Sequence, residues 1–184
     1  MKDAGGMSAP TIRPFETSEL AVVLDLINLA FADEGAAVAG LVEGLAQEVA
    51  ESPIRSFVAA NGSEVLGCIF FSPISLGIDN SILVYLLAPL GVHPVHQGLG
   101  VGRALVEGGI EELRRQGVNL VLVYGDPAYY GKFGFTTSAT ESFVPPYKLA
   151  FTEGWLGLQL NPYESLRDPV EIECVASLRD PRLW

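Results

Sequence analysis

The chain has 184 residues, 49% of them hydrophobic, and 11 basic against 22 acidic residues give it a formal net charge of −11 at pH 7. This acidic balance argues against a general affinity for nucleic acid, because phosphate backbones are bound by basic surfaces. The longest apolar-dominated run, residues 82–92, is shorter than the roughly 20 residues of a membrane-spanning helix and contains Pro89, so we expect no membrane partner.

The length predicts one domain that folds alone, losing roughly two-thirds of the surface that the unfolded chain exposes. Residues 1–10 carry no apolar stretch typical of a secretory signal, so we expect a flexible N-terminus followed by a single domain over residues 11–184. The two cysteines, Cys68 and Cys174, have no partner at metal-ligand spacing. They are expected to be buried thiols, and the protein is expected to be cytoplasmic.

Acidic residues concentrate in the first third of the chain. Nine of them lie from Glu16 to Glu64, where Arg55 is the only basic residue. The favoured interpretation is a solvated helix face that aids solubility, and the alternative is a surface that attracts amines. Positive charge that can help to hold an anion comes later, at Arg103, Arg114, Arg115 and Lys132.

The first predicted elements are a strand over residues 11–15 and two helices. Thr17 is the candidate N-cap of the first helix, and the second helix ends before Pro53. Each helix is marked by one apolar stripe, and both stripes are expected to face the core. The stripes are Leu20, Val23, Leu24, Ile27 and Phe31 in the first helix, and Val38, Leu41, Val42, Leu45 and Val49 in the second.

A hairpin and a long buried strand are predicted next. Residues 57–60 and 65–71 flank Asn61-Gly62-Ser63, and Asn-Gly tolerates the positive φ angles of a tight turn. Residues 81–92 form the long strand, which contains Pro89. Because proline cannot donate a hydrogen bond to a neighbouring strand, this position predicts a bulge or a place where the neighbour has moved away.

Three glycines alternate with apolar residues just before the next helix. They are Gly98, Gly100 and Gly102 in the segment HQGLGVGRAL, residues 96–105. Glycines at a helix start leave backbone N–H groups uncovered and let an anion such as a phosphate come close. The segment therefore predicts an anion-binding loop.

The helix after this loop is expected to stop at Gly117 and to pack closely at Gly108-Gly109. A strand over residues 118–124 follows it. The succession of strand, loop, helix and strand predicts a crossover between parallel strands.

Further along, Asp126-Pro127 predicts the N-cap and first residue of a short helix that runs to about Lys132. Gly134 is expected to end this helix, and Phe135 to start the next strand. Two more strands are predicted over residues 155–160 and 170–176, separated by a loop with two prolines.

Two of these segments together resemble a known family. Residues 90–94, LGVHP, with residues 97–105, QGLGVGRAL, resemble the acetyl-coenzyme A signature of the GNAT superfamily of N-acetyltransferases, whose core is Q/R-x-x-G-x-G/A. Residues 125–135, GDPAYYGKFGF, resemble the second signature of that superfamily, in the GDPxYYxxFGF form of a branch of bacterial acetyltransferases. The resemblance covers residues 11 to about 160.

Other glycine-rich motifs fit the loop less well. The dinucleotide fingerprint G-x-G-x-x-G fails, because its sixth position is Arg103 when counted from Gly98 and Leu105 when counted from Gly100. The P-loop fails because no Gly-Lys-Ser/Thr follows. A merely structural turn would explain the first signature but not the second signature behind it.

The resemblance implies an α/β fold of the acyl-CoA N-acyltransferase type, with helices flanking a central twisted mixed sheet that splays between its fourth and fifth strands. It implies acetyl-CoA as cosubstrate and no metal. The pantetheine arm would pair with the backbone of Leu90, Gly91 and Val92 at the splay. The pyrophosphate would be cradled by the amides of Gln97, Gly98, Leu99, Gly100, Val101, Gly102 and Arg103.

The reaction that the resemblance implies is direct attack of a primary amine on the thioester in a ternary complex, with a thiolate leaving. It places Tyr130 near the sulfur, where the hydroxyl can protonate or hydrogen-bond the thiolate, or where the ring is only a wall against the cofactor. Tyr129 is expected in the core, and His93 and His96 in exposed or capping roles. No residue is identified as the general base.

A second function stays open, that of a non-catalytic module that binds or senses acyl-CoA. The amine acceptor is not identified, and a small amine, an antibiotic and a protein N-terminus are all open. We expect its walls to come from the two early helices and the C-terminal loop. Residues 161–184 form an extension that is expected to close the acceptor side or to form a homodimer contact, so monomer and homodimer are both open.

Overall fold

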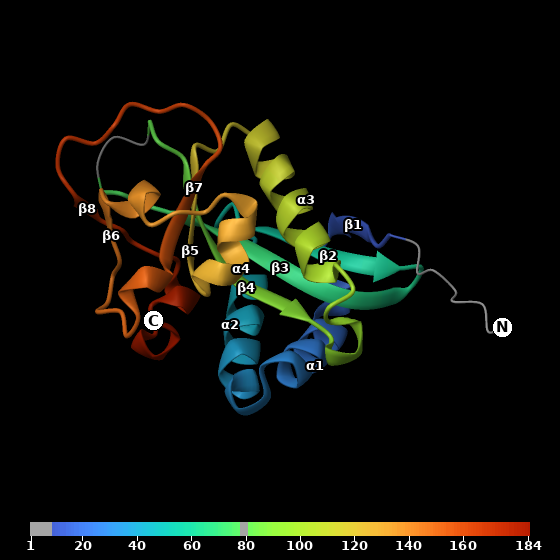
Figure 1. The fold of residues 1–184 in the computed structure, drawn as a ribbon. Coiled ribbons are helices and arrows are strands. Elements are labelled where there is room, and N and C mark those ends of the chain that lie inside the picture. The colour runs from blue at the N-terminus through green and yellow to red at the C-terminus, as the bar shows by residue number, and fades with distance from the viewer. Residues whose placement is uncertain (1–8, 78–80) are drawn as a thin grey trace.

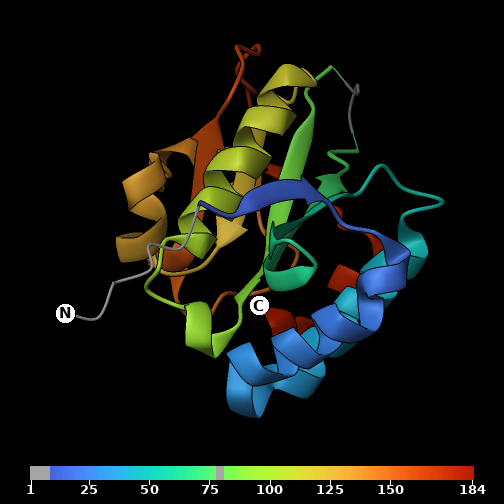
Figure 2. The same cartoon turned by 90° about the vertical axis from the view of Figure 1, so that its right-hand side faces the viewer.

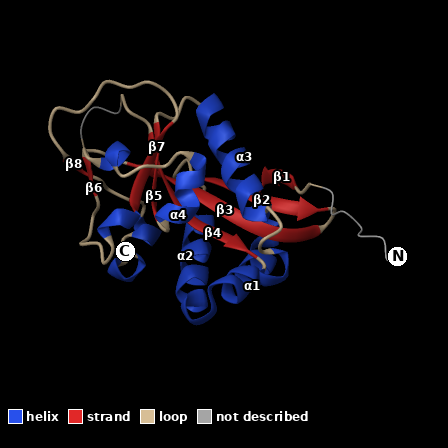
Figure 3. Ribbon diagram, viewed as in Figure 1, coloured by secondary structure: helices blue, strands red, loops and turns tan. Residues whose placement is uncertain are grey.

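The computed structural model describes residues 9–77 and 81–184, so the predicted flexible N-terminus lies, for residues 1–8, outside the described residues. The main sheet has six strands in the order β1-β2-β3-β4-β5-β7 (Figures 1 and 3). Neighbouring strands in this sheet run antiparallel, except β4 and β5, which run parallel. The predicted mixed sheet is therefore confirmed. The strands are β1 (Thr11–Pro14), β2 (Arg55–Asn61), β3 (Glu64–Ile74), β4 (Val84–Val92), β5 (Leu120–Tyr124) and β7 (Trp155–Gln159).

Helices cover both faces of the sheet. α1 (Leu20–Phe31) and α2 (Gly35–Glu48) lie on one face, and α3 (Val101–Arg115) lies on the other (Figures 1 and 2). The short helix α4 (Pro127–Tyr130) follows β5. The apolar stripes of α1 and α2 face the core as predicted, except that Val49 lies beyond α2 and is 40% exposed.

The predicted cap of the first helix is wrong by one residue. A turn of 3-10 helix, Thr17–Glu19, precedes α1, and Glu16 rather than Thr17 is its capping residue. The backbone N–H of Glu16 donates to Glu19 Oε2 at 3.1 Å. Glu19 also pairs with Arg13, whose Nη2 lies 2.6 Å from Oε1, and the hydrogen bond from Arg13 lowers the pKa of Glu19. A carboxylate at the third helical position therefore sets the start of this helix.

The hairpin and the irregularity at Pro89 are both confirmed. β2 and β3 are joined by a tight turn in which Gly62 has φ +59°. In the pairing of β3 with β4, Leu87 lies opposite Phe71 and Leu90 lies opposite Ile69. Ala88 and Pro89 therefore share a single partner position, which is a bulge.

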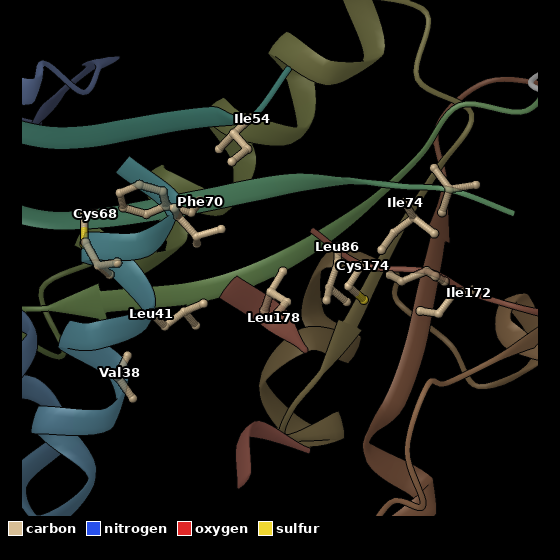
Figure 4. Close-up of a cluster of buried hydrophobic side chains, with 14 of the residues drawn as sticks. Val38, Leu41, Ile54, Cys68, Phe70, Ile74, Leu86, Ile172, Cys174 and Leu178 are labelled. Carbon is tan, nitrogen blue, oxygen red and sulfur yellow. The ribbon is translucent and has the colours of Figure 1, made fainter. Parts of the chain in front are cut away.

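The sheet separates two hydrophobic cores. The α2-side core contains α1, α2 and one face of the strands, and Figure 4 draws fourteen of its residues and labels ten of them. The α3-side core lies between α3 and the opposite face. Both cysteines are buried in the α2-side core, as predicted, and this burial raises the pKa of Cys68 and of Cys174 to about 12.

α3 lies very close to the sheet because of its two interior glycines. A β-carbon at Gly109 would overlap the ring of Phe71, and one at Gly108 would lie 3.1 Å from Ile12 Cγ2. The helix ends before Gly117, which has φ +82°. The predicted close packing, helix stop and parallel crossover are confirmed.

Two predicted strands differ in the structure. Phe135 does not begin a strand, because only Thr136 bridges to Gly157 before the chain turns into a 3-10 helix, Ser138–Thr140. The strand predicted over residues 170–176 is reduced to β8 (Val170–Glu171), which pairs with β6 (Phe143–Val144) outside the main sheet. Its alternate side chains do point inward, since Ile172 and Cys174 are buried, but β6 offers a backbone partner for two residues only.

Candidate active site

The sheet opens between β4 and β5. Their parallel pairing begins at Val84 opposite Leu120 and ends at Leu87 opposite Val123. β4 then continues to Val92 with β3 alone as its partner. The predicted splay between the fourth and fifth strands is confirmed, and Leu90, Gly91 and Val92 form the free edge of β4 beside it.

The glycine loop lies between this edge and α3. The side chain of Gln97 donates from Nε2 to the carbonyl of Val92 at 3.1 Å, so the loop is fastened to the end of β4. Gly98 and Gly100 have φ of +73° and +85°, in the left-handed region, and the space beside their α-carbons is open. The loop therefore presents bare backbone to solvent, and Leu99 between the two glycines is 57% exposed.

The first turn of α3 carries free N–H groups. Within residues 9–77 and 81–184, no protein acceptor bonds the amides of Val101, Gly102 and Arg103, which precede the first bonded amide at Ala104. A helix N-terminus of this kind attracts anions through its unpaired N–H groups and its dipole. The Arg103 side chain is exposed and pairs with Glu107 at 2.8 Å, so its charge is largely offset.

Tyr129 connects α4 to this helix start. A β-carbon at Gly102 would lie 2.7 Å from the Tyr129 hydroxyl oxygen, so the tyrosine reaches the first turn of α3 only because residue 102 has no side chain. Tyr129 is half-buried at the margin of the α3-side core, which agrees only in part with its predicted core position. Burial raises its pKa.

α4 holds Tyr130 at the opening of the sheet. Asp126 caps the helix as predicted, accepting from the Ala128 N–H at 2.8 Å. The Tyr130 ring makes edge contacts with Tyr129 at 5.1 Å and with Phe135 at 5.6 Å between ring centroids. These contacts fix the ring from two sides.

The chemical state of Tyr130 follows from its burial. Burial, with a smaller contribution from Tyr129, raises its pKa well above the ordinary value of 10. A thiol has a pKa of about 8.5, so a phenol of higher pKa donates a hydrogen bond to a thiolate more readily than it gives up its proton. Within the described residues, no hydrogen bond engages the Tyr130 hydroxyl.

A cavity of about 520 Å³ lies at the opening, on the side of α2. β4 and β5 contribute residues around the splay, and Tyr130 lines the same cavity. The remaining walls come from α1, α2 and the last residues of the chain. The lining residues are Phe31, Glu34, Ala37, Val38, Leu41, Leu86, Leu87, Ala88, Pro89, Leu90, Tyr124, Gly125, Tyr130, Leu178, Arg182, Leu183 and Trp184.

Only two of the lining residues are charged. Glu34 is exposed at the start of α2, and Arg182 comes from the end of the chain. Arg182 is bonded to Asp180, with Nε 3.0 Å from each carboxylate oxygen, and this contact lowers the pKa of Asp180 to about 2. The other lining residues are apolar or aromatic.

The two histidines do not reach the cavity. His93 Nδ1 accepts from the Val95 N–H at 3.4 Å and caps the short 3-10 helix Pro94–His96. His96 Nε2 lies 3.2 Å from Glu64 Oε1 on the surface. The capping role predicted for histidine is confirmed for His93.

Sequence reasoning expected the acceptor walls to come from the two early helices and the C-terminal loop, but it identified none of the individual residues that line the cavity there. Glu34 belongs to the acidic run for which a solvated face is the favoured interpretation, and no periodicity separates it from its neighbours. Trp184 lies 54 residues after Tyr130 and carries no motif. The aromatic and charged residues of the last nine positions were the only available signal.

Neither a metal centre nor a membrane segment is found in the described part of the chain. No group of three or more His, Cys, Asp or Glu side chains there is arranged to hold a metal ion. No helix within those ranges combines the length and apolar character that crossing a bilayer requires.

The comparison with protein families decides the classification. The family model described as the acetyltransferase (GNAT) domain matches residues 11–138. The chain belongs to the GNAT acetyltransferase family. That match contains the free edge of β4, the glycine loop, α3 and α4, whereas β7 and the final residues of the cavity wall lie beyond it.

Individual relatives in the GNAT family agree with this assignment. The chain is 37% identical over 113 residues to the uncharacterized N-acetyltransferase YjhQ of Escherichia coli, which covers 60% of the chain and 62% of YjhQ. It is 31% identical over 138 residues to the uncharacterized N-acetyltransferase YhbS of the same organism, and this match covers 74% of the chain and 70% of YhbS. The chain therefore spans less than two-thirds of the length of YjhQ.

Two solved GNAT structures resemble the fold. The crystal structure of YhbS in complex with CoA has a TM-score of 0.81 at 24% identity and covers 94% of this chain and 93% of its own. A GNAT acetyltransferase of Brucella melitensis in complex with acetyl-CoA has a TM-score of 0.71 at 26% identity, with coverages of 91% and 96%. The similarity to both extends beyond residue 138, since each covers more than nine-tenths of this chain.

Proposed function

We propose that this chain is an N-acetyltransferase that transfers the acetyl group of acetyl-CoA to a primary amine by direct attack in a ternary complex. The observation that carries the proposal is that one cavity is lined both by β4 residues at the splay and by Tyr130. An acyl donor lying along β4 and an acceptor in the cavity would therefore meet beside this tyrosine.

The residues around the splay fit coenzyme A. Its extended arm would lie along Leu90, Gly91 and Val92, where β4 pairs with β3 but no longer with β5. Its pyrophosphate would be held by the amides of residues 98–103, which the open glycine loop and the start of α3 leave accessible. The Gln97 N–H, predicted to share this role, instead donates to the Pro94 carbonyl at 3.3 Å. The CoA and acetyl-CoA complexes of the two GNAT structures support this proposal.

Backbone recognition also explains how an acidic chain can bind a polyanion. The anion would contact N–H groups and the positive end of a helix dipole, neither of which depends on net charge. Arg103 would add little, because Glu107 pairs with it. The net charge of −11 would instead disfavour binding to nucleic acid at other surfaces.

Acetyl-CoA supplies an activated acyl group in the form of a thioester. Tyr130 would donate a hydrogen bond to the sulfur position and so favour departure of the thiolate. The apolar walls of the cavity would exclude water from the acceptor, which protects the thioester from hydrolysis. Amine deprotonation is assigned to no side chain.

The extent of the functional unit follows from the cavity. Residues 11–184 would act as one N-acetyltransferase domain, because the walls of the cavity combine α1 and α2 with residues 178–184. All these walls belong to one chain, so the activity would not require a second subunit. The two buried, unpaired cysteines agree with a location in the reducing cytoplasm.

The experiment is a thiol-release assay with acetyl-CoA and a panel of primary amines, combined with calorimetric measurement of CoA binding. We expect CoA to bind and thiol release to depend on the amine. Binding without turnover for every amine would favour the alternative, a module that binds or senses acyl-CoA. Absence of binding would overturn both functions.

A further inference from the structure

We propose, building on the proposed function, that residues 176–184 are the specificity element of the acceptor cavity and that Glu48 is the residue that positions them. We call residues 176–184 the tail segment. The element selects a primary amine with an apolar body and no carboxylate. Three features support this proposal. They are the contact of the tail segment with α2, the cavity wall that the tail segment builds, and the negative charge of Glu34 at the cavity, which is unpaired within the described residues.

Glu48, at the end of α2, fastens the tail segment. Its Oε1 accepts from the backbone N–H of Ser177 at 2.8 Å and from the Ser177 hydroxyl, and its Oε2 accepts from the N–H of Ala176 at 3.1 Å. Hydrogen bonds to an ionised carboxylate are stronger than those between neutral groups. One side chain therefore holds the first turn of a segment that lies 128 residues away in the sequence.

Gly44 makes room for this contact one helical turn earlier. A β-carbon at residue 44 would overlap the hydroxyl oxygen of Ser177. Residues four apart lie on the same face of a helix, so Gly44 and Glu48 together form a docking place for Ser177. Figure 2 shows the red coils of the tail segment beside α2.

The fastened tail segment builds an apolar wall of the cavity. Leu178 is 2% exposed and packs in the α2-side core with Leu41 and Leu86, which Figure 4 also labels. The indole Nε1 of Trp184 donates to the carbonyl of Leu178 at 3.0 Å, so the end of the segment folds back on its start. Together with Leu183, these two side chains line the cavity.

Aromatic contacts hold Trp184 from the other side. Its ring lies 5.9 Å from that of Trp155 on β7 and 6.2 Å from that of Tyr147, between centroids. The Tyr147 hydroxyl in turn donates to the carbonyl of Arg179 at 2.5 Å. The Trp184 ring is thus fixed in an otherwise aliphatic wall, which is suited to the apolar body of an acceptor.

The charges at the cavity favour a cation. Arg182 is compensated by Asp180, and within the described residues Glu34 forms no ion pair. Among the side chains that line the cavity, the negative charge of Glu34 is therefore left without a partner, and it attracts an ammonium group and repels a carboxylate. An acceptor such as phenylethylamine matches these features, whereas phenylalanine, which adds a carboxylate, and ethanolamine, which lacks the apolar body, do not.

The experiment compares kcat/KM for these three amines in the wild-type protein and in Glu48→Gln. The carboxylate accepts hydrogen bonds from the Ala176 N–H, the Ser177 N–H and the Ser177 hydroxyl with two oxygens. The amide that replaces it has only one oxygen, and its NH₂ group cannot accept, so the tail segment would be held less tightly. We expect the wild type to prefer phenylethylamine over each of the other two by at least about tenfold. Glu48→Gln should raise the KM for phenylethylamine by about tenfold and leave the KM for acetyl-CoA unchanged.

Two further variants keep the outcome clear. Glu43→Gln changes an exposed carboxylate of the same helix and should leave all selectivities at their wild-type values. Trp184→Ala removes the wall itself and should reduce the preference for phenylethylamine over ethanolamine to the extent that Glu48→Gln does. Wild-type selectivity in both Glu48→Gln and Trp184→Ala, or an equal loss for all three amines, would overturn the inference.

The inference and the proposed function fail in different ways. Turnover of some amine without any preference for phenylethylamine overturns the inference and leaves the proposed function standing. No turnover with any amine overturns the proposed function, and the inference with it.

Discussion

The ring of Tyr130 lies directly against the α-carbon of Gly125. A β-carbon at residue 125 would lie 2.5 Å from Tyr130 Cε2, closer than such atoms can approach. Gly125 follows the last residue of β5, and both residues line the cavity. The position of the proposed sulfur-contacting hydroxyl is therefore set by the absence of a side chain at the end of β5.

The first prediction concerns the Tyr130 hydroxyl. Tyr130→Phe keeps the ring contacts with Tyr129 and Phe135 but removes the hydrogen-bond donor. A hydrogen bond to a charged group is worth about 1.5–3 kcal/mol, so kcat for thiol release should fall by about 10- to 100-fold with little change in the KM for acetyl-CoA. A larger fall, toward roughly 10³–10⁴, would instead assign proton transfer to the phenol. Unchanged kinetics would remove Tyr130 from the chemistry.

The second prediction tests the contact between Gly125 and Tyr130. Gly125→Ala should displace the ring and lower kcat at least as far as Tyr130→Phe does. Gly131→Ala is the matched control, because its β-carbon meets nothing within 4 Å and its backbone is helical. Since both changes act on one hydroxyl, the double variant Gly125→Ala/Tyr130→Phe should be no slower than the slower single variant. If the fall in kcat of the double variant equals the product of the two single falls, Gly125 acts by a route other than the Tyr130 hydroxyl.

The third prediction concerns the glycine loop. Valine at residue 100 would have to adopt φ +85°, which costs a β-branched residue about 1–3 kcal/mol. Its side chain would also occupy the proposed phosphate site. We expect Gly100→Val to abolish calorimetric CoA binding while circular dichroism stays that of the wild type. Gly102→Val is a poorer test, because its side chain would also displace Tyr129. Arg103→Ala, the control, should bind CoA nearly as well as the wild type.

Local sequence signals predicted much of the fold and part of the candidate site. Pro89 predicted the bulge because proline lacks a donor, and Asp126-Pro127 predicted α4 because a carboxylate caps its amides. The alternating glycines predicted an open helix start. Each of these signals acts within a few residues of its cause, so a single sequence reveals it.

Features that depend on distant partners were not predictable in the same way. The inward alternation of Ile172 and Cys174 indicates a strand, but its length is decided by β6, which lies about 27 residues earlier. The acidic run suggests a solvated face, and its members Glu34 and Glu48 instead face the cavity and the tail segment. Nothing in the order of residues connects Glu48 to Ser177, because their contact exists only after folding.

The fourth prediction concerns the buried thiols. Cys68 and Cys174 should not react with a thiol reagent at pH 8 in the native protein, and two equivalents should react in denaturant. Their folded pKa of about 12 exceeds the unfolded value of about 8.5, so the stability from neutral thiols is complete below pH 8.5 and decreases as the pH rises toward 12. The urea midpoint should therefore fall between pH 8 and 10.5, and less so in a variant with both cysteines changed to alanine. Rapid reaction of the native thiols would contradict the burial.

The fifth prediction compares two helical glycines that look alike in the sequence. Gly109→Ala places a methyl group on the ring of Phe71, which is fully buried, so the free energy of unfolding should fall by about 1–3 kcal/mol. Gly40→Ala, in the interior of α2 with nothing within 4 Å, should raise it by about 1 kcal/mol, because alanine favours the helix. Urea unfolding measures both. If overlap with Phe71 is the cause, Phe71→Leu should cost less in the Gly109→Ala background than in the wild type, and equal costs would point to a different cause.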